Sequence, residues 1–201
     1  VNLGGTAIGT GLNAEKNYIY SVIERLRALT GLGLSRNENM IDGTQNADVF
    51  VEVSGLLKAC ATTLIKISGD LRLLSSGPRA GLGELRLPDL QAGSSIMPGK
   101  VNPVIPEMLS QVAYQTIAQD LAISLAAQGG QLELNAFLPL IAANLLPAME
   151  TLSRAMRILA ERCIKGIEAV PEQCLNHLNN SIGIITALSP QIGYDVAAQL
   201  A

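Results

Sequence analysis

The residues best suited to chemistry lie together between residues 93 and 103, in the stretch G-S-S-I-M-P-G-K-V-N-P. Two hydroxyls, one amine and one carboxamide are carried there by Ser94, Ser95, Lys100 and Asn102. A hydroxyl can take up or release a proton, an ammonium group can hold a carboxylate, and an amide can hydrogen-bond a second oxygen. This combination suits a small dicarboxylate whose reaction passes through a carbanion, with the charge delocalised into a carboxylate.

The glycines and prolines of this stretch predict a shaped loop rather than a helix. Loops carried by a rigid frame are common places for functional sites. The stretch does not match a nucleotide-binding P-loop, because five residues separate Gly93 from Gly99 and because Val101 follows Lys100 where that loop needs Ser or Thr. The structural alternative is that the serines only cap turns and that the lysine is a solvated surface residue.

The composition is that of a globular protein. The chain has 201 residues, of which 48% are apolar and 15% are charged, so it can bury a core. Aromatic residues make up only 3%, which favours closely packed helices over a β-sandwich. The net charge of -3, without a basic cluster, gives no indication of a nucleic-acid partner. The most apolar run, residues 134–149, is shorter than the roughly 20 residues of a membrane-spanning helix, so no membrane partner is expected.

Cysteine and histidine do not indicate a metal site. The three cysteines, Cys60, Cys163 and Cys174, lie far apart and form no Cys-x-x-Cys pair. They predict free, reduced thiols in a cytoplasmic protein. The only histidine, His177, lies in C-L-N-H-L-N and is expected to be an ordinary residue on a helix surface or interface.

The spacing of apolar residues predicts an all-α fold built as a bundle of long antiparallel helices. Thr44 is expected to be the N-cap of the second helix, and Pro139 and Pro147 are expected to kink the fourth. Helices are expected over residues 14–29, 44–74, 103–128, 132–165, 171–179 and 191–199.

The predicted organisation is a central helical-bundle domain over residues 1–165, followed by the beginning of a small helical C-terminal domain over residues 166–201. Between two of the expected helices, residues 77–103 show no sustained period. A connection of this length is unusual inside a compact domain unless it has a function. The loop chemistry and the missing periodicity therefore indicate the same segment.

Several segments resemble the aspartase/fumarase superfamily, and residues 93–103 resemble its signature loop. The resemblance continues in V-N-L-G-G-T-A-I-G-T-G-L-N (1–13), D-L-R-L-L-S-S-G-P-R-A-G-L (70–82), G-Q-L-E-L-N (130–135) and N-S-I-G-I-I-T (180–186). These variants are more similar to the aspartate ammonia-lyases than to the class II fumarases, which typically have D-I-R-W-L-A-S-G-P-R and F-E-L-N. The resemblance implies a lyase that reversibly deaminates L-aspartate to fumarate and ammonia. The alternatives are a class II fumarate hydratase and a catalytically silent oligomerisation core.

The resemblance also implies roles for single residues of the loop. Ser94 matches the family's general base, which removes a proton from the carbon next to the β-carboxylate of L-aspartate. Lys100 and Asn102 match residues that bind this carboxylate as it becomes an aci-carboxylate. Ser95, Gly99 and neighbouring backbone N–H groups are expected to support the base when the loop closes.

Two further positions bear on the implied site. Glu107 matches the carboxylate that pairs with a catalytic histidine of another segment, although an acid in a first helical turn is also favoured by the helix dipole. Leu138 stands where the family usually has a charged residue before a proline. This departure leaves the substrate within the superfamily open.

In the family, each active site combines segments of three subunits of a homotetramer. We therefore expect this chain to form a homo-oligomer, either a dimer or a tetramer. The family's threonine-histidine pair and its serine-threonine-asparagine segment would precede Val1, so the chain is expected to be a fragment that is inactive alone. The elimination requires no cofactor. Mg²⁺ activates some family members, but no ligand cluster for it can be assigned in this sequence.

Overall fold

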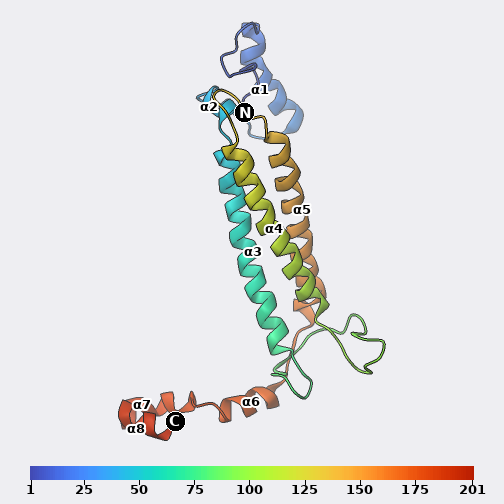
Figure 1. The fold of residues 1–201 in the computed structure, drawn as a ribbon, viewed down its shortest axis with the longest axis vertical. Coiled ribbons are helices and arrows are strands. Elements are labelled where there is room, and N and C mark those ends of the chain that lie inside the picture. Colours follow the sequence, from blue (N-terminus) through green and yellow to red (C-terminus); the bar gives the residue numbers. More distant parts are fainter. The chain divides into compact units, whose positions relative to one another are not determined.

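The computed structural model describes all residues from Val1 to Ala201. It confirms the predicted all-α class, with eight α-helices and one small sheet (Figure 1). None of the helices combines the length and the apolar character that crossing a lipid bilayer requires. The helices are α1 (Lys16–Thr30), α2 (Asp42–Gln45), α3 (Asp48–Leu74), α4 (Val104–Gln128), α5 (Leu138–Arg162), α6 (Pro171–Asn179), α7 (Ile184–Ile192) and α8 (Tyr194–Leu200).

The sheet is a ribbon of two short antiparallel strands, β1 (Leu85–Arg86) and β2 (Glu168–Ala169). A single 3-10 turn, Ile164–Gly166, lies between α5 and β2. Strands of two residues are too short to show a period of two in the sequence, so the ribbon was not predicted.

The chain divides into two compact units. The first comprises Val1–Thr63 and Val112–Arg154, and the second comprises Leu64–Gln111 and Ala155–Ala201. The long helices α3, α4 and α5 each contribute residues to both units. The domain boundary expected at residue 166 stays a prediction.

The core of the first unit shows how the long helices run. Buried residues come from the position directly before α3, the end of α4 and the start of α5, so successive helices are antiparallel, as predicted. The cluster consists of Ala47, Ile123, Ala126, Ile141 and Leu145, with Val51, Leu57 and Ala127 packed against it.

The second helix begins later than predicted, and the expected N-cap is wrong. Thr44 lies inside the short helix α2, where its hydroxyl donates a hydrogen bond to the Met40 carbonyl (2.7 Å). The same hydroxyl accepts a hydrogen bond from the Asn2 amide (3.2 Å). The Thr44 oxygen therefore bonds to Met40 and Asn2 and does not cap α3. Helix α3 begins instead at Asp48, whose carboxylate lies in the first turn, where the helix dipole favours it.

Helix α5 also begins later than predicted, at Leu138 rather than near residue 132. The preceding residues form a tight turn, in which Gln131 and Leu134 make an isolated antiparallel bridge. Leu132 adopts a positive φ of 52°, a conformation that a helix does not allow. At the other end of the chain, α7 was not predicted, and α8 replaces the helix expected over residues 191–199.

Asn135 explains why the chain turns here. Its side chain is buried, and its amide nitrogen donates to the carbonyls of Ala126 (3.1 Å) and Ala127 (3.0 Å) at the end of α4. Its amide oxygen accepts from the Phe137 N–H (2.8 Å), immediately before α5. One side chain therefore bonds to two carbonyls at the end of α4, of which Ala126 also accepts from the Gly129 N–H (3.3 Å), and it fixes the approach to α5.

Candidate functional site

The loop that resembles the signature segment lies in the second unit, where residues 87–103 join β1 to α4. Its ends are held together by an antiparallel bridge between Ala92 and Val101. Next to this bridge, the Gly93 N–H donates to the Lys100 carbonyl at 2.7 Å. We call the bridge and this hydrogen bond the neck, and we call residues 93–100, which it encloses, the tip.

Asn102 lies against the start of the tip. A Cβ atom placed on Gly93 would come within 2.9 Å of the Asn102 Oδ1 atom and of the Lys100 carbonyl oxygen. Only glycine therefore leaves room for the amide at this position. Because Gly93 directly precedes Ser94, the neck places the Asn102 amide next to the residue before the first serine.

Ser94 lies in a turn in which two backbone N–H groups donate to its hydroxyl oxygen. The Oγ atom accepts hydrogen bonds from the N–H groups of Ile96 and Met97, each at 3.2 Å. The serine therefore caps a turn, as the structural alternative expected. The same two donors would also stabilise negative charge on this oxygen, so the two interpretations are compatible.

The other predicted loop residues differ in exposure. Ser95, Gly99 and Lys100 are exposed, whereas Ser94 and Asn102 are half-buried. Gly99 has a φ of +77°, in the left-handed region that favours glycine.

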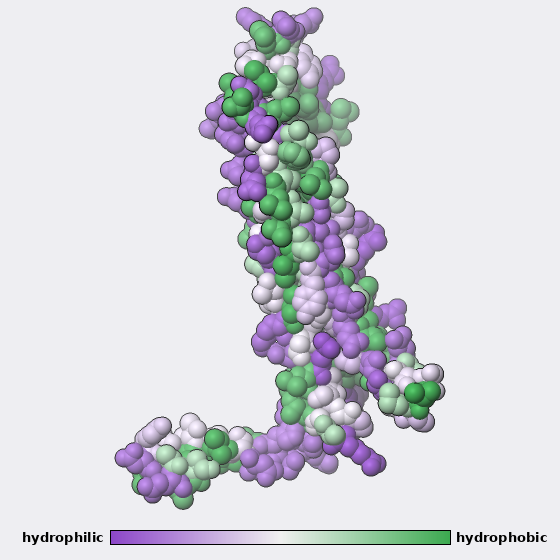
Figure 2. All heavy atoms as spheres, viewed as in Figure 1, coloured by the Kyte–Doolittle hydropathy of each residue, from purple (hydrophilic) through white to green (hydrophobic).

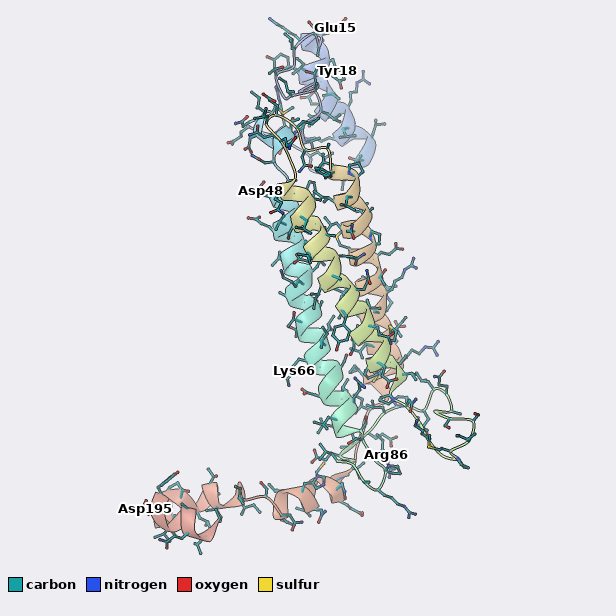
Figure 3. The ribbon with its side chains drawn as sticks, in the orientation of Figure 1. Glu15, Tyr18, Asp48, Lys66, Arg86 and Asp195 are labelled. Carbon is teal, nitrogen blue, oxygen red and sulfur yellow. The ribbon has the colours of Figure 1, made fainter.

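A cleft of about 670 Å³ opens at the base of the loop, within the second unit. It brings together Lys100, Asn102 and Gly99, but the two serines do not line it. Arg86 of β1, labelled in Figure 3, adds a second cation. The remaining lining residues include Asp89, Glu168, Gln173 and Ser75. Lys100 and Asn102 therefore line one cavity that is large enough for a small organic ligand.

Glu107 lies in the first turn of α4 and faces the end of α3. Its Oε1 atom is 3.9 Å from the Arg72 Nη2 atom, and both side chains are partly exposed. The only histidine of the chain, His177, lies on α6 and pairs with Glu84 instead. No histidine of this chain therefore reaches Glu107. The contact with Arg72 was not predicted, because no sequence spacing links residues so far apart.

Cysteines and acidic residues offer no metal centre, since no group of three or more His, Cys, Asp or Glu side chains is arranged to hold an ion. All three cysteines are free, with Cys163 buried, Cys174 partly buried and Cys60 exposed. Burial raises the pKa of the Cys163 thiol, which disfavours its thiolate form.

Comparisons with known proteins agree with the resemblance. The sequence profile of the family described as Lyase matches residues 1–118. Aspartate ammonia-lyase of Pseudomonas aeruginosa is 53% identical to the whole chain, which covers 42% of that protein. Aspartate ammonia-lyase of Bacillus subtilis is 47% identical, again over the whole chain and 42% of the relative. The chain thus spans less than half the length of these relatives.

Solved structures share the fold. A fumarate lyase:delta crystallin from Brucella melitensis, bound to cobalt, is 54% identical and superposes with a TM-score of 0.92 over 99% of this chain and 43% of its own. A class II fumarase from Schistosoma mansoni is 38% identical, with a TM-score of 0.88 over the whole of this chain and 45% of its own. The chain therefore belongs to the lyase family of the aspartase/fumarase superfamily, as its signature loop predicts.

Proposed function

We propose that this chain is the part of an aspartate ammonia-lyase that carries the signature loop, and that the complete enzyme reversibly converts L-aspartate into fumarate and ammonia. The names of its relatives, which are about half identical over the whole chain, support this substrate. The observation that carries the proposal is the pair of N–H groups, from Ile96 and Met97, directed at the Ser94 hydroxyl oxygen.

In the proposed first step, Ser94 acts as the general base in its alkoxide form. It removes the proton from the carbon next to the β-carboxylate, and the electron pair of the broken C–H bond passes into that carboxylate. A neutral serine hydroxyl is too weak a base for this proton, so the hydroxyl must first lose its own proton to water. The two N–H donors at 3.2 Å stabilise the resulting alkoxide, and the proton taken from the substrate returns to water before the next turnover.

The intermediate is an aci-carboxylate that carries more negative charge than the substrate. The Lys100 ammonium and the Asn102 amide are proposed to donate hydrogen bonds to its oxygens. Both groups line the same cleft, which supports a shared ligand. Interactions that strengthen as this charge develops lower the barrier rather than only tightening substrate binding.

In the second step, the electron pair forms the double bond of fumarate while the bond from the α-carbon to nitrogen breaks. The α-ammonium group leaves as neutral ammonia, so this step needs no additional proton. Ser95 and Gly99 are proposed to support the tip as it closes, with Gly99 supplying the positive φ. No cofactor takes part in this scheme.

Glu107 is proposed to pair with a histidine that another segment supplies. Arg72 lies 3.9 Å from this carboxylate and is its ion-pair partner within this chain. The site is thus proposed to be completed by other copies in a homotetramer, and the 201-residue chain is expected to be inactive alone. The free thiols agree with the expected cytoplasmic location.

The test is a fumarate absorbance assay on the complete polypeptide with L-aspartate as substrate. Ser94→Ala is expected to lower kcat by about 10²- to 10⁴-fold, because general-base catalysis is lost. Sedimentation should show the same assembly as the wild type. Ser153→Ala, at an exposed position of α5, is the matched control and should retain full activity.

If Ser94→Ala turned over at the wild-type rate, the assignment of the base would be wrong. If the wild type released no fumarate from L-aspartate, the substrate would be wrong.

A second candidate is a class II fumarate hydratase, favoured by the superposition on the class II fumarase from Schistosoma mansoni. The same assay with L-malate distinguishes the two activities. Fumarate formed from malate but not from aspartate would select the hydratase.

A further inference from the structure

Glu84 joins three parts of the second unit through its backbone and its side chain. Its N–H donates to the Leu74 carbonyl at the end of α3 (2.9 Å). Its carbonyl accepts from the Val170 N–H (2.9 Å), which continues the pairing of β1 with β2. Glu84 directly precedes β1, and β1 leads into the signature loop. We call residues 84–88, which lead from the end of α3 through β1 into the loop, the stem of the loop, and Glu84 is its first residue.

The side chain of Glu84 extends this junction to helix α6. Its Oε1 atom lies 2.7 Å from the Nδ1 atom of His177, and both side chains are about two-thirds buried or more. Because an ionised carboxylate can only accept, the imidazole donates through Nδ1. The Cys174 thiol, one turn earlier on the same face of α6, lies 3.8 Å from the Glu84 carbonyl oxygen.

We propose that the Glu84–His177 pair is a latch that docks α6 against the stem of the signature loop, and that both residues are positioning residues for the reaction. This inference rests on the proposed function for its catalytic part. A second contact supports the same stem, since a Cβ atom on Gly166 would lie only 2.6 Å from the Pro88 Cγ atom. The segment after α5 thus packs against the stem at both ends of β1.

The Glu84–His177 pair matters because the β1–β2 ribbon, which also holds the stem to the segment before α6, is small. Strands β1 and β2 pair over only two residues each, and an isolated ribbon of this size is marginal in water. A hydrogen bond to a charged group shifts such an equilibrium by about tenfold or more. Loss of the pair should therefore loosen α6 and leave the loop stem less ordered, while the long helices remain folded.

Cys174 provides a readout that does not depend on catalysis. In the complete polypeptide, the rate of alkylation of each cysteine by iodoacetamide can be followed by peptide mass. His177→Leu is expected to raise the rate at Cys174 about tenfold, because the thiol leaves the Glu84 carbonyl. The exposed Cys60, which lies on α3 in the first unit, serves as the internal reference and should not change.

Three further variants separate the latch from a general packing effect. His177→Asn places an amide N–H near the position of Nδ1, so it should keep the Cys174 rate within about twofold of the wild type. Asn179→Ala changes an exposed residue of the same helix and is the matched control. Glu84→Ala keeps the backbone hydrogen bonds, and it should reproduce His177→Leu without adding to it in the double variant.

The catalytic arm measures fumarate formation from L-aspartate. His177→Leu and Glu84→Ala are each expected to lower kcat about tenfold and to change KM less than about twofold, because the loop must close on bound substrate. Tryptic cleavage after Lys100 should become faster in both variants. His177→Asn should keep kcat near the wild-type value. If His177 mattered only because its replacement unfolds part of the protein, this variant would have no reason to differ from His177→Leu.

Unchanged Cys174 alkylation and unchanged kcat in both single variants would overturn the latch. Additive effects of His177→Leu and Glu84→Ala in the double variant would also overturn it, because the two residues would then act independently. If the wild type did not convert L-aspartate, the proposed function would fail by itself, and Cys174 alkylation and Lys100 cleavage would still decide whether the latch exists.

Discussion

The Lys58 ammonium lies 2.5 Å from the Asp120 carboxylate and joins α3 to α4 inside the first unit. The other carboxylate oxygen of Asp120 accepts a hydrogen bond from the Ser54 hydroxyl at 2.7 Å. The Asp120 side chain is only 8% exposed, whereas Lys58 is 47% exposed. The aspartate is thus a buried charge whose partners approach from a single helix.

This pair predicts a loss of stability in acid. Burial by itself would raise the pKa of Asp120, but the hydrogen bonds from Lys58 and Ser54 and the charge of Lys58 outweigh it, so the pKa lies below its ordinary value. A lowered pKa in the folded state stabilises the fold above the ordinary value, near 4, and this contribution disappears as the pH falls through the folded pKa. Urea midpoints at pH 7 and pH 3 should therefore differ more for the wild type than for Asp120→Asn.

Glu52→Gln, at an exposed position of α3, is the control and should keep the wild-type pH dependence. Equal pH dependence in wild type and Asp120→Asn would show that this carboxylate does not contribute.

The Asn135 side chain predicts a second stability effect. Asn135→Leu removes the side-chain amide that donates to the Ala126 and Ala127 carbonyls, and only Ala126 keeps a donor, the Gly129 N–H. The substitution is expected to destabilise the complete polypeptide by about 1–3 kcal/mol. The measurement is the urea midpoint at neutral pH. The matched control is Asn144→Ala, since the exposed Asn144 amide bonds only to its own helix at Leu140. A change in Asn144→Ala as large as in Asn135→Leu would contradict the capping role.

The close approach at Gly93 predicts a catalytic effect. In Gly93→Ala, the new Cβ atom would displace the Asn102 amide, so kcat for L-aspartate is expected to fall by at least about tenfold while the fold persists. Gly33→Ala is the control, because a Cβ atom there meets nothing within 4 Å. Wild-type turnover in Gly93→Ala would mean that Asn102 is not held in its working position by the neck.

The exposed apolar side chains of the long helices predict self-association. Figure 2 shows apolar residues, coloured green, over these helices. The most exposed are Leu56, Leu121, Leu73 and Leu146. Many further apolar residues of α3, α4 and α5 are also exposed, and exposed apolar surface on this scale is typical of interfaces. Sedimentation of the complete polypeptide should give a dimer or a tetramer, and Leu56→Glu combined with Leu121→Glu should weaken it. A wild-type monomer would contradict this expectation.

The sequence predicted the helices in which apolar residues recur at a regular helical spacing. The periods of α1 and α4 placed these helices within about two residues, because apolar periodicity sustained over 15 and 25 residues is a strong signal. The loop over residues 93–103 was found by its residue types. By contrast, the start of α5 depends on the Asn135 side chain bonding to carbonyls of another helix, and no local pattern contains that information.

The residues proposed for the candidate site come from the sequence, and their arrangement comes from the structure. The types of Ser94, Lys100 and Asn102 indicate their chemistry, yet only the fold shows that the lysine and the amide share a cleft that the serine does not line. The Glu84–His177 pair was missed for a related reason. His177 was expected to be an ordinary helix residue, and its partner lies far away in the chain.

The neck of the loop also has an entropic consequence. The contacts between Gly93 and Lys100 and between Ala92 and Val101 already hold the ends of the tip together before any ligand arrives. Only about half of residues 87–103 then remains to be ordered on closure, and halving a flexible loop lowers the free energy of closing it by about 0.6 kcal/mol. Under the proposed function, ligand binding therefore has to restrict a short tip rather than the whole connection, which leaves more of the binding free energy for the reacting groups.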